Sequence, residues 1–276
     1  MNYLELNCIV FPPRFSEIVI ALLSDYGFES FADTEKGFSA YIPEKNFDIA
    51  TFEALEIFSN KEIRITYALN KIPEQNWNAI WETNFEPVLI GSECYIRAPF
   101  HPVLAGIRYE IIIEPKMSFG TGHHETTHMM SVLLMEQNVC GKDVLDMGCG
   151  TAVLAILAKK MGASEVMAVD NDEWAFSNAI ENIERNHVSE IRVMHGDAAL
   201  IGAQQFDLIL ANINRNVLLS DIPAYASALK KGGTLLLSGF YESDVLQINQ
   251  KTEQCGLHHE RYITMNSWCA SVYSNR

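Results

Sequence analysis

The segment VLDMGCGTAVLAILAKKMGA, residues 144–163, decides the fold of this chain. It reads as a short apolar strand, a glycine turn and then a helix with few polar residues, which is typical of a unit of a parallel α/β sheet. Gly148 and Gly150 allow the backbone to approach a ligand where a Cβ would collide. Ligands in such sheets bind beyond the carboxyl ends of the strands, so we expect a ligand site at this turn.

The spacing of the turn distinguishes two classes of ligand. A dinucleotide fingerprint, G-x-G-x-x-G, would require a third glycine where the chain has Val153. Instead, Asp146 lies two residues before the first glycine. A carboxylate there would repel a pyrophosphate, but it suits the amino end of a bound amino-acid moiety. The turn therefore favours S-adenosylmethionine over a nucleotide.

Short apolar runs continue to alternate with helical stretches through the rest of the chain. This rhythm predicts βαβ units that build a parallel, doubly wound sheet. Strands are expected at residues 143–147, 165–169, 191–194, 206–211 and 234–238.

Three polar residues follow the later strands of this pattern. Asp170, after the second strand, can accept hydrogen bonds from both ribose hydroxyls, although Asp170, Asn171 or Asp172 could also cap the next helix. Asp197, after the third, can accept from an adenine amino group or serve as a turn residue. Asn212 ends the fourth, where Asn is otherwise common in turns. The ordered set, more than any single residue, predicts one cofactor crevice.

The segment EPKMSFGTGHHETTH, residues 114–128, precedes the sheet. Its glycines and threonine at 120–122 predict a flexible turn, and Thr126 and Thr127 place hydroxyls at the start of a helix.

A metal site in this segment is disfavoured. Although His124 and His128 are four residues apart and could share a helical face, no third ligand is apparent except Glu125, which points off that face. The general-base glutamate of an HExxH motif is also missing. We expect no bound metal.

Residues 1–72 predict a small α/β unit of their own. The expected order is β-α-β-β-α-β, the order of a ferredoxin-like sandwich, a fold that hosts many functions. The strands are expected at 3–9, 28–33, 37–42 and 62–69, and the helices at 15–26 and 47–58.

A linker helix is expected at 73–87, because Trp77, Trp81 and Phe85 fall on one helical face. The favoured interpretation is packing of this stripe against one domain; ligand stacking is the alternative. Residues 88–276 form the second domain, which we expect to begin with strands at 89–98 and 108–113.

Composition narrows the class of protein. The chain has 276 residues, 20 basic and 35 acidic, for a formal charge of −15, and 48% are hydrophobic, which excludes a disordered polyelectrolyte. The acidity argues against direct nucleic-acid binding. The sequence shows no export signal, no run of about 18 apolar residues and no framework of cysteines, so we expect a cytoplasmic protein with free thiols and no membrane association.

The charge is unevenly spread. Residues 1–85 carry 6 basic and 13 acidic groups, net −7, and residues 86–276 carry 14 and 22, net −8. The small domain has roughly twice the negative charge density, which predicts electrostatic attraction of a lysine-rich partner.

The sequence strongly resembles the ribosomal protein L11 methyltransferase (PrmA) family. The resemblance covers the whole second domain, and the FGTGHHETT string is specific to this family. The matching strings are MSFGTGHHETT (117–127), VLDMGCGTAVLAILAKKMGA (144–163), AVDNDEWAFSNAIENIERN (168–186), FDLILANI (206–213) and SWCA (267–270).

The resemblance implies a class I, Rossmann-like methyltransferase domain, a helical linker that lets the small domain reposition, and substrate recognition by that small domain. It implies S-adenosylmethionine as cofactor and amines of ribosomal protein L11 as substrate: lysine side chains and, in some members, the α-amino group. The family's cofactor contacts fall on Thr127, Gly148, Asp170 and Asn212, with Phe119, Gly120 and Thr121 alongside.

The chain departs from the family at Ala152, where relatives usually have the last glycine of the motif. We expect this alanine to be tolerated if its φ is negative, but to crowd the methionine end of the cofactor.

The expected reaction is an in-line displacement by a neutral amine, in which the side-chain oxygen of Asn212 orients the amine and stabilises developing charge. Alternatives are a class I methyltransferase of another protein, of RNA or of a small-molecule amine, a NAD-dependent oxidoreductase, or a cofactor-binding module without activity. Nothing in the sequence demands a dimer, and we expect a monomer.

Overall fold

The computed structural model describes residues 3–34, 37–60, 62–72, 86–116 and 118–276. The chain groups into two compact units, residues 1–84 and 85–276, which are described separately. The expected linker helix at 73–87, with Trp77, Trp81 and Phe85, falls almost wholly outside the described residues and stays a prediction.

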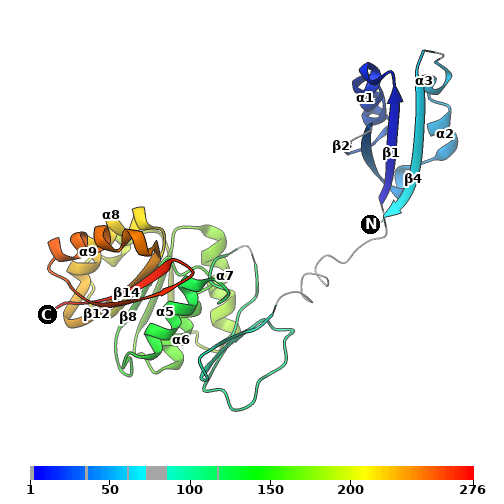
Figure 1. The fold of residues 1–276 in the computed structure, drawn as a ribbon. Helices are drawn as coiled ribbons and strands as arrows, with labels where there is room; N and C mark the ends of the chain where they lie inside the picture. Colours follow the sequence, from blue (N-terminus) through cyan, green and yellow to red (C-terminus); the bar gives the residue numbers. More distant parts are fainter. Residues whose placement is uncertain (1–2, 35–36, 61, 73–85, 117) are drawn as a thin grey trace. The chain divides into compact units, whose positions relative to one another are not determined.

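The first unit is a four-stranded antiparallel sheet with its helices on one face (Figure 1). The sheet order is β2-β3-β1-β4, as expected for a ferredoxin-like sandwich. Its elements are β1 (Tyr3–Phe11), α1 (Ser16–Tyr26), β2 (Ser30–Thr34), β3 (Gly37–Pro43), α2 (Ile49–Glu53), α3 (Glu56–Ser59) and β4 (Arg64–Ile72), with 3₁₀ turns at Pro13–Phe15 and Glu44–Asn46.

Two backbone positions, Gly27 and Leu55, set the limits of the helices in this unit. Gly27, at φ 122°, closes α1 by donating its N–H to the carbonyl of Leu23, which confirms the predicted end. The expected single helix at 47–58 was wrong, because the backbone at Leu55 turns extended (ψ 133°) and separates α2 from α3. The Leu55 side chain packs against the core of the unit.

The second unit is built on a seven-stranded sheet of order β10-β9-β8-β11-β12-β14-β13. The first five strands are parallel, and β14 is antiparallel to β12 and β13. All five predicted strands are confirmed, whereas the antiparallel β13–β14 hairpin was not predicted. The strands are β8 (Val144–Met147), β9 (Val166–Asp170), β10 (Arg192–His195), β11 (Phe206–Asn212), β12 (Leu229–Tyr241), β13 (His258–Met265) and β14 (Trp268–Ser274).

Helices cover both faces of this sheet (Figure 1). In β11, Leu208 and Leu210 pack into the cluster with α5, α6 and α7, while Ile209 and Ala211 pack into the cluster with α8 and α9. This alternation buries both faces and confirms the doubly wound α/β fold. The helices are α5 (Glu125–Met135), α6 (Val153–Lys160), α7 (Glu173–Arg185), α8 (Arg215–Ala228) and α9 (Val245–Gln254), with 3₁₀ turns η3 (Ala198–Ile201) and η4 (Glu242–Asp244).

A separate three-stranded sheet precedes α5: β5 (Val88–Ile90), β6 (Cys94–Arg97) and β7 (Tyr109–Ile112). The single strand expected at 89–98 was wrong, since Gly91 at φ 59° turns the chain between β5 and β6. The small sheet packs into the same apolar cluster as α5, α6 and α7.

The six cysteines are free thiols, as expected. Among the described residues, no helix has the length and apolar character needed to cross a membrane.

Candidate functional site

A cavity of about 430 Å³ lies at the carboxyl ends of the parallel strands. It is lined after β8 by Gly148 and Gly150, at the end of β9 by Asp170, and at the end of β11 by Asn212. Because β11 follows β8 in the sheet while β9 and β10 lie on its other side, this is the point where strand order reverses. The site is therefore where the fold predicts a ligand.

A second cavity of about 150 Å³ adjoins the first and contains Asp197, at the end of β10. The two cavities share Gly148, Asp170, Asn171, Ile213 and Asn214.

The two glycines of the turn are required by neighbouring protein atoms. Both have positive φ, 66° at Gly148 and 54° at Gly150. A Cβ at Gly148 would lie 2.0 Å from the Ile213 side chain, and one at Gly150 would lie 2.2 Å from the carbonyl oxygen of Phe119. The expected close approach of a ligand is thus accompanied by close approach of two other protein segments.

Asp170 is held in the wall by hydrogen bonds to both carboxylate oxygens. Oδ2 accepts from the backbone N–H of Gly150 at 2.8 Å, and Oδ1 accepts from that of Asp172 at 3.0 Å. Each oxygen keeps a further lone pair that a ribose hydroxyl can use. The cap of α7 is Asp172, which accepts from Ala175 N–H at 2.8 Å.

Asp197 has the turn role that its sequence position allowed, and it also lies at a cavity. Its Oδ1 accepts from the N–H of Ala199 at 2.9 Å and caps η3, and the residue also lines the smaller cavity. A carboxylate fixed in this way can accept a hydrogen bond from an adenine amino group.

The side chain of Asn212 carries an unused acceptor. Its Nδ2 donates to Thr127 Oγ1 at 3.3 Å, and its Oδ1 is buried with no partner among the described residues. A buried carbonyl oxygen without a partner is costly, so its presence in a cavity wall fits a ligand that brings an N–H. The glycine turn and the two carboxylates fit S-adenosylmethionine, which carries a ribose and an adenine.

Not every predicted residue reaches the cavity wall. Thr127 is fully buried behind Asn212, and Gly120 and Thr121 are not among the lining residues. Phe119 lines the wall and is 51% exposed.

Asp146 also lies outside the wall, in contrast to the expected contact with an amino group. It is 1% exposed, and its Oδ2 accepts from the N–H of Ala155 at 3.0 Å in the first turn of α6. Burial raises the pKa of this carboxyl to about 7. Asp146 thus serves as an acceptor for the start of α6, whose N-cap residue, Ala152, has no side-chain acceptor.

Ala152 does not meet the condition of a negative φ, and the expected crowding of the site is not seen. Its φ is +63°, a left-handed conformation, and its side chain is fully buried in the apolar cluster of α5, α6 and α7. It does not line either cavity. The methyl group therefore does not crowd the site.

The turn at 120–122 is packed tightly, contrary to the expected flexibility. The Gly120 carbonyl accepts from Thr151 Oγ1 at 2.6 Å, and the Phe119 carbonyl accepts from Thr151 N–H at 2.9 Å. A Cβ at Gly122 would lie 2.9 Å from the Ile96 side chain. These contacts fix the segment against the glycine turn.

Aromatic rings that the sequence reading did not assign to the site form its rim. His124 and Trp268 line the larger cavity with Phe119, and the rings make edge contacts: 5.0 Å between the centroids of Phe119 and His124, and 4.8 Å between those of His124 and Trp268. Tyr241 stacks on Trp268 at 4.2 Å. Only the pairing of β14 with β12, which no local pattern revealed, brings Trp268 and Tyr241 together.

The histidines have structural contacts. His124 caps α5, its Nδ1 accepting from Thr126 N–H at 3.2 Å. Within the described part of the chain, no three His, Cys, Asp or Glu residues are grouped so that they could hold a metal ion.

Comparison with known proteins identifies relatives along almost the entire chain. The family model described as ribosomal protein L11 methyltransferase (PrmA) matches residues 22–276. A Phocaeicola vulgatus protein named ribosomal protein L11 methyltransferase is 43% identical over 275 residues, 98% of each chain. A Porphyromonas gingivalis protein of the same name is 46% identical over 258 residues, 92% of this chain and 89% of that protein.

A solved structure shares the fold. The ribosomal protein L11 methylase of Lactobacillus delbrueckii subsp. bulgaricus superposes with a TM-score of 0.64 at 26% identity, covering 69% of this chain and 98% of that one.

Proposed function

The chain belongs to the ribosomal protein L11 methyltransferase (PrmA) family, and from this premise we propose that it methylates amino groups of ribosomal protein L11. It is an S-adenosylmethionine-dependent methyltransferase with the class I fold. The acceptor groups that we propose are lysine side chains and the N-terminal α-amine.

One observation supports this proposal most directly: the buried, unpartnered Oδ1 of Asn212 in the cavity wall. This oxygen can accept an N–H of the acceptor amine, which would orient the nitrogen lone pair and stabilise the positive charge that develops on nitrogen. Because Nδ2 donates to Thr127 Oγ1, the amide is held in the orientation that leaves Oδ1 as the atom without a partner. We propose Asn212 as the catalytic residue.

The cofactor would be held by residues at three strand ends, those of β8, β9 and β10. When bound, S-adenosylmethionine supplies a methyl group made electrophilic by its sulfonium. Asp170 would accept from the ribose hydroxyls and Asp197 from the adenine amino group, while the turn at Gly148 and Gly150 gives the space. Thr127 would hold the side chain of Asn212, and Phe119 would contact the cofactor at the cavity wall. Gly120, Thr121 and Asp146 would support the segments that form this wall.

The aromatic rim suits an approaching lysine. An unperturbed lysine has a pKa of about 10.4 and is almost wholly protonated at neutral pH, so the site must admit or generate the neutral amine. Phe119, His124 and Trp268 present apolar ring surface at the cavity, which can pack against the aliphatic stem and exclude water from the amine.

The acidic N-terminal unit supports a basic protein as substrate. Residues 1–85 carry a net charge of −7, and we propose that residues 1–72 recognise the substrate, 73–87 link, and 88–276 catalyse. We further propose a monomer that acts in the cytoplasm without direct contact to nucleic acid.

The deciding experiment is mass spectrometry of purified ribosomal proteins after incubation with the enzyme and cofactor. We expect mass gains in multiples of one methyl group on L11, and a much smaller gain with Asn212→Ala at the same enzyme concentration and time. A mass gain on a protein other than L11 would overturn the substrate assignment. Methylation of a small amine with no mass gain on any ribosomal protein would overturn it as well.

A further inference from the structure

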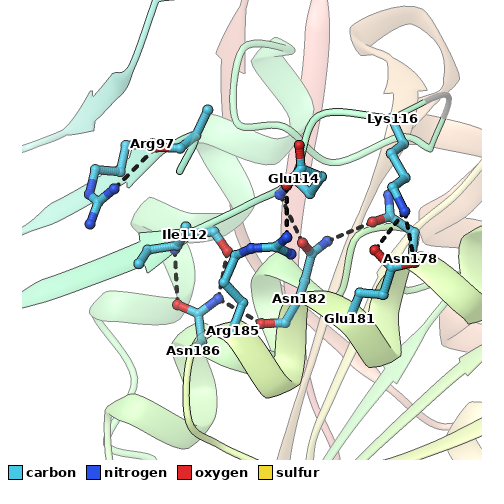
Figure 2. Close-up of polar contacts among 10 residues, drawn as sticks. Arg97, Ile112, Glu114, Lys116, Asn178, Glu181, Asn182, Arg185 and Asn186 are labelled. Atoms are coloured by element: carbon cyan, nitrogen blue, oxygen red, sulfur yellow. Dashed lines mark hydrogen bonds and ion pairs between the residues drawn. The ribbon is translucent and has the colours of Figure 1, made fainter. Parts of the chain in front are cut away.

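A ladder of buried asparagines runs along α7. Asn178, Asn182 and Asn186 are spaced by four residues, so they share one helical face, and each is at most 5% exposed. Figure 2 shows that this face is turned toward β7 and the segment that follows it. Buried asparagines are rare unless their amide groups are used, so each position calls for an account of its contacts.

Asn182 joins two segments that are far apart in the sequence. Its Oδ1 accepts from the backbone N–H of Glu114 at 2.8 Å (Figure 2). Its Nδ2 donates to the carbonyl of Thr151 at 3.1 Å and to Asn178 Oδ1 at 3.2 Å. One side chain thus links the entry of the segment 114–124 to the cofactor turn.

Thr151 continues the connection to the cavity wall. Its N–H and hydroxyl donate to the carbonyls of Phe119 and Gly120, and the adjacent Gly150 N–H donates to Asp170. Asn182 therefore holds Glu114 directly and Phe119 through Thr151. Phe119 and Asp170, at the ends of these connections, both line the cavity.

From these contacts we propose that Asn182 is a positioning residue for methyl transfer, acting through Thr151 to keep the cofactor turn and the Phe119 segment in one geometry. This proposal rests on the proposed function only for its effect on turnover. Its effect on cofactor binding requires no acceptor protein.

The chemistry of the position requires an asparagine. An aspartate keeps the acceptor for Glu114 but loses both donors and places a charge beside the Thr151 carbonyl. A leucine of similar size loses all three contacts. The ion pairs around the ladder, Lys116 with Glu181 and Arg185 with Glu114, are about one third or more exposed and contribute much less to holding the segments.

Asn186 provides a matched control on the same helix. It is 5% exposed, its Oδ1 accepts from Ile112 N–H at 2.9 Å, and its Nδ2 donates to the carbonyls of Ile112 and Asn182. It therefore holds β7 to α7 through the same kind of contacts, but it does not contact Thr151.

The first test compares Asn182→Asp with Asn186→Asp by calorimetric titration with S-adenosylmethionine. We expect both to lower the melting temperature, but only Asn182→Asp to raise the cofactor Kd by about tenfold and to lower kcat with little change in the acceptor KM. Equal changes in Kd for the two variants would show that Asn182 only stabilises the fold and would overturn the proposal.

The second test uses the unmodified protein and so does not depend on the folding of a variant. Amide hydrogen exchange is measured with and without saturating S-adenosylmethionine. We expect exchange of the Glu114 and Thr151 amides to slow at least tenfold, while the Ile112 amide, held by Asn186, changes less than twofold. No slowing at Glu114, or the same slowing at all three amides, would contradict the proposed coupling.

Discussion

The amide of Asn212 donates to the hydroxyl of Thr127, 85 residues earlier in the chain, across 3.3 Å. This hydrogen bond sets which end of the amide is free, because the nitrogen is engaged while Oδ1 has no partner among the described residues. An acceptor oxygen held in this way does not need to reorient when an amine arrives, which is the condition for electrostatic preorganisation.

Replacing Thr127 by valine keeps the shape of the side chain but removes the acceptor for Asn212 Nδ2. We expect the single-turnover rate to fall about fivefold, since one hydrogen bond of this type contributes about 1 kcal/mol. Thr127→Ser retains the hydroxyl and serves as the control, with a rate within about threefold of wild type. If both variants lose rate to the same extent, the Thr127 hydroxyl does not orient the Asn212 amide.

Substitution of Asn212 itself by alanine is expected to lower turnover more than cofactor affinity. The reason is that its free oxygen is assigned to the amine rather than to the cofactor. Rapid-quench kinetics and calorimetry on the same preparation measure the two quantities. An unchanged single-turnover rate would remove Asn212 from the mechanism.

Gly148→Ala is expected to destabilise the protein and weaken cofactor binding, because the new Cβ would lie 2.0 Å from the Ile213 side chain at a φ of 66°. The double variant Gly148→Ala with Ile213→Ala removes the clash and should recover part of the affinity. Gly150→Ala has no such rescue, since its Cβ would meet the backbone carbonyl of Phe119 at 2.2 Å. Thermal denaturation and calorimetric titration measure both effects, and failure of the double variant to recover would argue against the clash.

Ala152→Gly is expected to change the free energy of unfolding by less than about 1 kcal/mol. Relief of the left-handed conformation favours glycine by about 1–2 kcal/mol. Loss of a buried methyl group and the greater entropy of the unfolded chain oppose it by about the same total. Cofactor Kd should stay within threefold, because Ala152 lies outside the cavities. A large gain in affinity would restore the idea that this methyl group crowds the cofactor.

The buried carboxyl of Asp146 predicts a pH dependence of stability. Its pKa is raised from 3.8 to about 7 in the folded protein, so between about pH 4 and 7 the folded state binds a proton that the unfolded state has released. The contribution of Asp146 to stability therefore falls as pH rises through this window and is constant above it. Asp146→Asn should remove the slope, gaining at least about 1 kcal/mol relative to wild type from pH 4 to pH 8, since one pKa unit corresponds to about 1.4 kcal/mol.

Urea denaturation of both proteins across this pH range measures the difference. Parallel stability curves would contradict the raised pKa. Because Asp146 supports α6 rather than the cavity wall, we also expect the cofactor Kd of Asp146→Asn to stay within threefold at pH 8.

Salt should weaken methylation of whole protein substrate if the acidic N-terminal unit attracts it. The Debye length falls from about 10 Å at 0.1 M to about 3 Å at 1 M ionic strength, so kcat/KM should drop while kcat changes little. A short lysine peptide, which offers few charges to the small domain, is the matched control. The same salt response for both substrates would contradict steering by this unit.

Sequence periodicity was sufficient for the parallel part of the sheet. Four of the five parallel strands contain largely buried apolar runs, whereas β10 is partly exposed, and all five were predicted from their alternation with helices. The polar residues after them, Asp170, Asp197 and Asn212, lie at the cavities as the order implied. Local patterns could not reveal the β13–β14 hairpin, since β13 is almost wholly exposed and β14 is recognisable only by its pairing with β12.

Two features of backbone geometry also could not be predicted from the sequence. The positive φ of Ala152 is not favoured by its residue type, and the packed turn at Gly120 depends on a hydrogen bond from Thr151, 31 residues away. The asparagine ladder on α7 was missed for the same reason, because a polar residue within an amphipathic helix reads as part of its solvated face until the opposing strand is known.

Trp268 makes the cavity depend on the strand that completes the sheet. The wall joins Phe119 to a residue on β14, and bringing together segments so distant in sequence costs loop-closure entropy before the contact is made. A partly folded chain would lack a competent site, so cofactor at 100 times its Kd would stabilise only the completed domain, by about 2.7 kcal/mol. Supply of the methyl donor in the cell would then govern the lifetime of the enzyme as well as its rate.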